Sequence, residues 1–95
     1  MISERIRQLR KAFNISQVEL ANKLGVTKQC ISNWENDNIL PSIDMLVKLS
    51  ILFNVSTDYL LGLTKERYLS LEGLNDEEIA HIKFIVQDIV KNKSK

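Results

Sequence analysis

Apolar residues recur three and four positions apart along most of this 95-residue chain. That spacing places them on one face of an α-helix, whereas a half-buried strand would alternate apolar and polar residues. Together with the capping residues, it predicts helices over residues 2–13, 17–24, 28–35, 43–53, 57–61 and about 75–91. No alternating run of four or more residues is bounded by turns, so we expect an all-α fold.

Two short helices joined by a tight turn are predicted between residues 16 and 36. Ser16 is a good N-cap, and Glu19 three residues later completes a capping box. Gly25 stands where the chain must reverse, which suits a residue that accepts a positive φ. Thr27 then caps the second helix. We expect the rest of the chain to be organised around this pair.

The second helix of the pair has two kinds of surface. Ile31 and Trp34, three positions apart, predict its buried face. Its other positions are small, polar or cationic: Lys28, Gln29, Cys30, Ser32, Asn33 and Asn36. A surface of that kind is suited to meet hydrogen-bonding groups outside the protein.

Serine residues can also cap three other predicted helices. Ser3 can cap the first helix, Ser42 follows Pro41 and can cap the fourth, and Ser56 can cap the fifth. Five short helices in about 60 residues predict a small helical domain, followed by an irregular connector over residues 63–74. Because the connector carries apolar residues, we expect it to lie against other parts of the protein.

The last predicted helix is amphipathic and carries opposite charges at its two ends. Asn75 and Glu78 repeat the capping box within an acidic first turn, and Lys91, Lys93 and Lys95 make the other end basic. Its apolar residues are Ile79, Ile82, Ile85, Val86, Ile89 and Val90. This face is too short for a free coiled coil but sufficient for packing. It can pack against its own domain or against a second copy of the chain, and we favour the second copy.

Composition mainly excludes classes of protein. The chain is 44% hydrophobic and 26% charged, which is typical of one globular domain with a modest core. A net charge of +1 does not by itself indicate a nucleic-acid partner. One cysteine excludes an intramolecular disulfide and argues against a thiolate metal site. With no apolar run of about 18 residues and no secretory segment, we expect no membrane association and a cytoplasmic location.

The residues from about Ile2 to Gly62 resemble the phage repressor and Cro type of helix-turn-helix domain, the XRE-like regulators. The resemblance rests on SQVELANKLGVT, ISNWEN, the Pro-Ser opening of the fourth helix and the closing DYLLG, all in the family's order and spacing. It implies a five-helix DNA-binding domain over residues 1–62, with the connector 63–74 and the C-terminal helix 75–95 outside the match. Asp37 departs from the glycine that the family often has there and places a carboxylate near the expected phosphates.

The resemblance also implies a function. It indicates a sequence-specific transcriptional regulator, most often a repressor, that binds a pseudo-palindromic double-stranded DNA operator as a homodimer. Helix 28–35 would enter the major groove, and helix 17–24 would lie across the DNA backbone. The residues expected to read bases are Thr27, Lys28, Gln29, Ser32 and Asn33. The residues expected to bind phosphates are Arg10, Gln17 and Asn36.

Other functions have less support. Glu35 has no second carboxylate or histidine spaced to act with it, so we expect it to pair with a basic side chain or a backbone N–H rather than to catalyse. His81 has no neighbouring metal-ligand residues, and we expect no metal, cofactor or small-molecule ligand. The alternative is a protein-interaction module whose last helix docks an antitoxin or antirepressor-type partner. The polar row on helix 28–35 argues against it, because interface cores are more aromatic.

Overall fold

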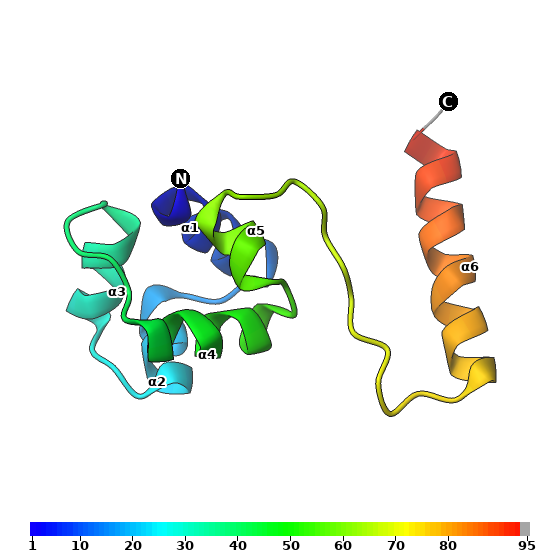
Figure 1. Ribbon diagram of the computed structural model, residues 1–95, viewed down its shortest axis with the longest axis horizontal. Coiled ribbons are helices and arrows are strands. Elements are labelled where there is room, and N and C mark those ends of the chain that lie inside the picture. Colours follow the sequence, from blue (N-terminus) through cyan, green and yellow to red (C-terminus); the bar gives the residue numbers. More distant parts are fainter. Residues whose placement is uncertain (94–95) are drawn as a thin grey trace.

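The computed structural model describes residues 1–93, and that part of the chain contains helices and no strands. The helices are α1 Ile2–Ala12, α2 Gln17–Leu24, α3 Lys28–Glu35, α4 Ile43–Phe53, α5 Thr57–Leu61 and α6 Asp76–Lys93. Figure 1 shows α1 to α5 packed together and α6 standing apart at the end of a long connector. The predicted all-α fold, five helices plus a C-terminal helix, is confirmed. Lys95, predicted at the basic end of the last helix, lies outside the described residues.

Side-chain caps begin α2 to α5 where the sequence places them. The Ser16 hydroxyl accepts the Glu19 backbone N–H at 3.0 Å, and the Glu19 carboxylate accepts the Ser16 N–H at 3.1 Å, which completes the capping box. Thr27, Ser42 and Ser56 each accept the backbone N–H three residues further on. Because each cap satisfies an N–H that the helix leaves without a helical partner, the four starting points are set locally.

The first helix begins at Ile2, as predicted, but it lacks the predicted cap. Its N-cap is Met1, with no side-chain cap, and Ser3 lies inside the first turn and is only 5% exposed. The prediction that Ser3 caps this helix is therefore wrong. Ser3 is buried and Ile2 packs partly against the core, so these contacts accompany the first turn in place of a side-chain cap.

Residues in left-handed conformation make the turns on either side of α3. Gly25 has φ 73°, as the reversal between α2 and α3 requires. Asp37, where we noted the departure from glycine, has φ 60°. Asp tolerates this conformation better than most residues, so the turn after α3 keeps its shape without a glycine.

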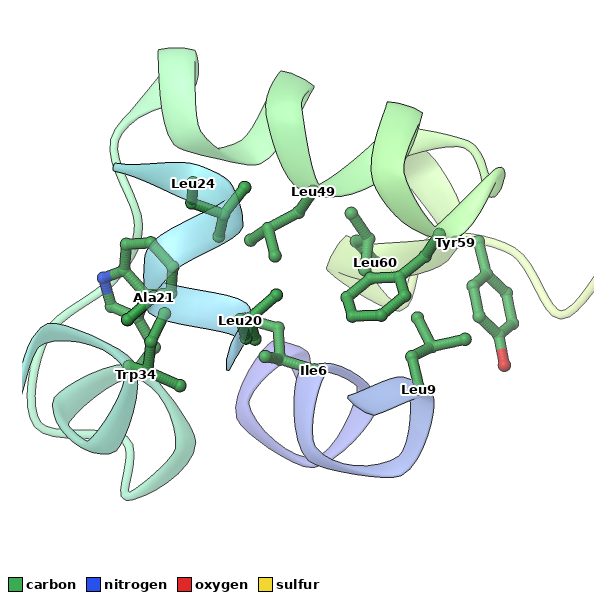
Figure 2. Close-up of a cluster of buried hydrophobic side chains, with 11 residues drawn as sticks. Ile6, Leu9, Leu20, Ala21, Leu24, Trp34, Leu49, Tyr59 and Leu60 are labelled. Atoms are coloured by element: carbon green, nitrogen blue, oxygen red, sulfur yellow. The ribbon is translucent and has the colours of Figure 1, made fainter. Parts of the chain in front are cut away.

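The core lies where the five helices meet (Figure 2). Its fully or nearly fully buried apolar residues are Ile6, Leu9, Leu20, Ala21, Leu24, Ile31, Trp34, Leu49, Phe53, Tyr59 and Leu60. The buried positions of Ile31 and Trp34 confirm the predicted inner face of α3. On α4, Leu49 and Phe53 are buried, and Met45, Leu46 and Leu52 pack against the core.

The connector and α6 differ in their relation to this core. Arg67 of the connector lies over the Tyr59 ring at 4.7 Å from its centroid, and the Ser70 N–H donates to Asn54 Oδ1 at 3.3 Å. The connector therefore lies against the domain at these points, as predicted. No residue of α6 is buried, so the structure does not place its apolar face on the five-helix domain. None of the helices in residues 1–93 is long and apolar enough to cross a membrane.

Candidate nucleic-acid interface

The outer face of α3 brings the predicted base-reading residues together. Ile31 and Trp34 hold the helix against α1 and α2, with 0% and 3% of their surfaces exposed. Lys28 and Gln29 are exposed on the outer side, and Asn33 is partly exposed one turn further along. The helix is therefore anchored by two apolar side chains and presents hydrogen-bonding groups to solvent.

Gln29 and Asn33 form a hydrogen-bonded pair on this face. Gln29 Nε2 donates to Asn33 Oδ1 at 3.0 Å, across one turn of the helix. The bond fixes both amides, so that Asn33 Nδ2 offers donors while Gln29 Oε1 offers an acceptor. An acceptor beside a donor is the arrangement that complements the major-groove edge of adenine.

Two further predicted base-reading residues, Thr27 and Ser32, carry hydroxyl groups. Thr27 Oγ1 accepts the Cys30 N–H at 3.1 Å, which leaves the hydroxyl hydrogen able to donate outward. Ser32 Oγ accepts Asn36 Nδ2 at 3.2 Å and keeps its own hydrogen in the same way. Each hydroxyl therefore keeps a hydrogen that a guanine O6 or a phosphate oxygen can accept.

Arg7 of α1 forms hydrogen bonds with the C-terminal end of α3. Its Nη2 donates to the Glu35 carbonyl oxygen at 2.8 Å and to Asn36 Oδ1 at 3.3 Å. Asn36 is also the C-cap of α3, and through its Nδ2 it reaches Ser32. A chain of hydrogen bonds thus runs from α1 through Asn36 to a residue on the outer face of α3.

Glu35 is the centre of a second, more buried network. Arg10 Nε lies 2.6 Å from Glu35 Oε2, and Arg10 Nη2 donates to Oε1 at 3.1 Å. Gln17 Nε2 donates to the same Oε1 at 3.2 Å. Only 1% of the Glu35 side chain and 13% of the Arg10 side chain are exposed. The expected pairing of Glu35 with a basic side chain is confirmed.

This network sets the charge state of its two ions. Burial alone raises the pKa of Glu35, but hydrogen bonds from Arg10 and Gln17 and the positive charges of Arg10 and Arg7 outweigh it and hold that pKa below its ordinary value. The hydrogen bond to Glu35 raises the pKa of Arg10 above its ordinary value. The carboxylate and the guanidinium are therefore both charged at neutral pH.

The network also changes the interpretation of two predicted phosphate-binding residues. Arg10 turns inward, since its Nη1 donates to the Ile15 carbonyl oxygen at 3.0 Å while Nε and Nη2 hold Glu35. Three of its five N–H groups are thus used within the protein. Gln17 also directs an amide N–H inward, to Glu35. Phosphate binding by Arg10 and Gln17 stays a prediction, and each has a structural role beside it.

From the sequence we named Arg10 as a phosphate-binding residue and did not connect Arg7 or Arg10 with α3. One signal was present: Arg7 and Arg10 are three residues apart, so both face the same side of α1, and Glu35 follows the core residue Trp34 directly.

The geometry gives no support for a metal site in the described part of the chain. Within residues 1–93, no group of three or more histidine, cysteine, aspartate or glutamate side chains is arranged to hold a metal ion.

Comparison with known proteins identifies the same region of the chain. The helix-turn-helix family model matches residues 6–60, which is more than half of the 95 residues. Over 78 residues the chain is 40% identical to YobD, an uncharacterized HTH-type transcriptional regulator of Bacillus subtilis, a match that covers 82% of this chain and 70% of YobD.

Several solved structures are similar in fold and sequence. One is the c2 repressor of Salmonella phage P22 in complex with a synthetic operator, with a TM-score of 0.61 and 38% identity over 63% of this chain and 91% of that one. Another is the N-terminal DNA-binding domain of SinR from Bacillus subtilis, with a TM-score of 0.62 and 42% identity over 70% and 97%. A complex of SinR with SinI has a TM-score of 0.62 and 30% identity, and the match covers 100% of both chains.

These similarities all include the segment that builds α1 to α5 and the outer face of α3. They agree with the resemblance that the sequence motifs indicate, and they connect the chain with regulators rather than enzymes. The chain therefore belongs to the helix-turn-helix family of DNA-binding transcriptional regulators, of the XRE or Cro/C1 type.

Proposed function

We propose that this protein is a transcriptional repressor that binds a pseudo-palindromic double-stranded DNA operator as a homodimer, with α3 in the major groove. The observation that carries the proposal is the division of α3 into an anchored inner face and a polar outer face. The solved structure of the similar P22 c2 repressor is a complex with a synthetic operator, which supports operator binding by this chain.

Base recognition is assigned to the outer face of α3. The residues are Thr27, Lys28, Gln29, Ser32 and Asn33. The paired amides of Gln29 and Asn33 suit adenine, and the Lys28 ammonium suits guanine O6 and N7. Four or five base pairs per half-site fall within reach of a helix of this length.

Phosphate binding is assigned to residues that border α3. Gln17 and the first turn of α2 would contact the backbone on one side, and Asn36 on the other. Arg10 would add its remaining N–H groups while it holds Glu35. Because these contacts carry no sequence information, they would fix the register of α3 for every DNA sequence alike.

This assignment gives each of the three segments of the chain a separate role. Residues 1–62 would read DNA, residues 63–74 would connect, and residues 75–95 would dimerise through the exposed apolar face of α6. A palindromic site requires two reading domains related by a two-fold axis, which a dimer supplies. A regulator of this kind acts in the cytoplasm, beside the chromosome.

Gln29→Ala tests the proposal against Gln17→Ala. Binding to a selected operator and to single-base variants is measured by titration. Gln29→Ala should reduce discrimination at one position by about 1–3 kcal/mol, whereas Gln17→Ala should weaken all sequences alike. Gln8→Ala, an exposed glutamine on α1, is the control and should change neither. Unchanged discrimination in Gln29→Ala would show that α3 is not the reading helix as assigned.

A second function has one observation in its favour. The similarity to the complex of SinR with SinI extends over the whole chain, beyond the reading domain. The alternative is therefore that α6 docks a different small protein, of antirepressor or antitoxin type, on a helix-turn-helix platform. Selection of bound DNA from a random pool separates the two, since a pure interaction module would enrich no sequence.

A further inference from the structure

The apolar face of α6 is a continuous stripe along the whole helix. We call it the α6 stripe, and its residues are Ile79, Ile82, Ile85, Val86, Ile89 and Val90. At 100° per residue they span roughly 140° of the circumference. Most are about half exposed, as Val86 is at 53% and Ile89 at 51%, which is far above the exposure of core residues. A surface of this size requires burial in an assembly.

Two charged residues lie within the same arc, one at each end of the stripe. Glu78 is in the first turn of α6 and Lys93 is in the last. Glu78 accepts the Asn75 N–H through one carboxylate oxygen at 3.0 Å, which leaves the other oxygen for a second partner. When two such helices pair, these two charges favour one relative orientation of the helices over the other.

From these charges we infer that two copies of the chain pair through their α6 stripes in antiparallel orientation. In a pair centred near residue 84, Glu78 of one copy lies within one helical turn, about 4.5 Å along the axis, of the position that faces Lys93 of the other. This inference rests on the proposed homodimer and specifies its arrangement. A parallel pair would bring the two Lys93 ammonium groups together at one end of the helix–helix interface. It would also bring the two acidic first turns together at the other end, so like charges would repel at both ends. The antiparallel pair places opposite charges at both ends.

Lys83 is the residue that could favour the parallel pair, because it would then approach Glu78 of the partner copy. It lies outside the α6 stripe, roughly 90° from its centre, and is exposed. An ion pair at such an exposed position contributes little. Lys93 lies within roughly 10° of the centre of the stripe, so its surroundings weigh more in the choice of orientation.

A hollow beside the middle of the α6 stripe agrees with an antiparallel two-fold axis. The hollow has a volume of about 340 Å³ and is lined by Leu69 and Leu71 of the connector and by Lys83, Gln87, Ile82 and Val86 of α6. In an antiparallel pair centred near residue 84, Ile82 of each copy lies opposite Val86 of the other. The two hollows then meet at the axis, where each can receive apolar side chains of the other copy.

The antiparallel pair also suits a palindromic operator. With a rise of 1.5 Å per residue, the two α6 helices begin about 24 Å apart at opposite ends of the pair. The two connectors then lead outward toward half-sites that are about 34 Å apart. In a parallel pair both helices would begin side by side, about 8–10 Å apart, and the connectors would have to cover almost the whole separation.

Disulfide cross-linking tests the orientation. In a Cys30→Ser background, Ile79→Cys and Ile89→Cys chains are mixed under mild oxidation and resolved by non-reducing electrophoresis. The antiparallel pair predicts a disulfide between the two different chains, and predicts none within either chain type alone. Both positions lie outside the core of the reading domain, so helical content should be retained.

The possible outcomes separate this inference from the proposed function. Cross-links within Ile79→Cys alone would establish a parallel pair, overturning the inference while leaving the dimer. No cross-links in a chain that is dimeric by light scattering would remove α6 from the interface and overturn it as well. A monomeric wild-type chain would overturn both the inference and the proposed homodimer.

A charge reversal tests the pairing of Glu78 with Lys93 independently. Lys93→Glu places two acids together in the antiparallel pair and should raise the dimer dissociation constant about three- to tenfold. Lys91→Glu is the matched control, since it changes the same charge at the same helix end but points away from the α6 stripe, and should have a smaller effect. Equal effects of the two variants would overturn the pairing.

Discussion

Arg10 of α1 and Glu35 of α3 form a close ion pair, with Arg10 Nε 2.6 Å from Glu35 Oε2. The pair crosses the interface between the first helix and the helix that we assign to the major groove. Burying two charges costs hydration energy, so the pair adds little net stability compared with apolar residues of similar volume. Its effect is to favour one position of α3, because any displacement leaves a buried carboxylate without its partner.

Arg10→Met should therefore destabilise the protein strongly. Removal of the guanidinium leaves Glu35 buried and unpaired, which should lower the free energy of unfolding by about 3–5 kcal/mol. Urea denaturation measures this value. Lys11→Met removes a charge from an exposed neighbouring position of α1 and should change it by about 0.5 kcal/mol or less. Equal losses in the two variants would show that the pair does not hold α3.

Acid should unfold the protein through the same pair. The pKa of Glu35 in the folded state lies below its ordinary value of 4.5, so the unfolded state binds more protons between the two values. The stability that the carboxylate contributes is fully present above about pH 4.5 and is lost as the pH falls through the folded-state pKa. Urea midpoints from pH 6 to pH 3 measure this loss. Glu35→Gln, although less stable, should show a smaller decrease over that range, and an unchanged decrease would assign it to other carboxylates.

Local signals in the sequence were sufficient for most of the fold. The bounds of α2 to α5 were predictable because Ser16, Thr27, Ser42 and Ser56 each cap a helix through an N–H only three residues away. The predicted cap at Ser3 was wrong because Ser3 is buried inside the first turn, and burial depends on residues far along the chain.

The candidate site was less accessible to sequence reasoning for the same physical reason. The outer face of α3 could be predicted from the spacing of Ile31 and Trp34 alone. The inward turn of Arg10 depends on Glu35, which is 25 residues away and reaches it only when α1 packs on α3. No local pattern distinguishes an arginine that meets DNA from one that meets a buried carboxylate.

Arg7 should influence DNA discrimination without contacting a base. It holds Asn36, which in turn donates to Ser32 on the outer face of α3. Arg7→Met should weaken operator binding by about 1 kcal/mol and relax discrimination at the base pair nearest Ser32. Because 42% of the Arg7 side chain is exposed, stability should fall much less than in Arg10→Met.

Lys11→Met separates positioning from charge in this comparison. Both variants remove one positive charge from α1, so any general loss of attraction to phosphates should appear in both. Discrimination between the operator and single-base variants, measured by titration, should change only in Arg7→Met. If the two variants lose affinity equally for all sequences, Arg7 acts through its charge and the chain of hydrogen bonds to Ser32 does not matter for recognition.

Operator binding should depend only weakly on salt. The chain carries 13 lysine and arginine residues against 12 aspartate and glutamate residues, and two of the basic residues near α3 are engaged with Glu35. Each phosphate neutralised contributes a slope of about −0.9 to the plot of log K against log salt concentration. With Lys28 as the exposed cation on the outer face of α3, we expect a slope of about −2 to −4 for a dimer. Titrations between about 50 and 200 mM salt measure the slope. A slope of about −8 would require several more phosphate-neutralising groups per reading domain. Recognition would then depend on general charge attraction rather than on the hydrogen bonds of Gln29 and Asn33.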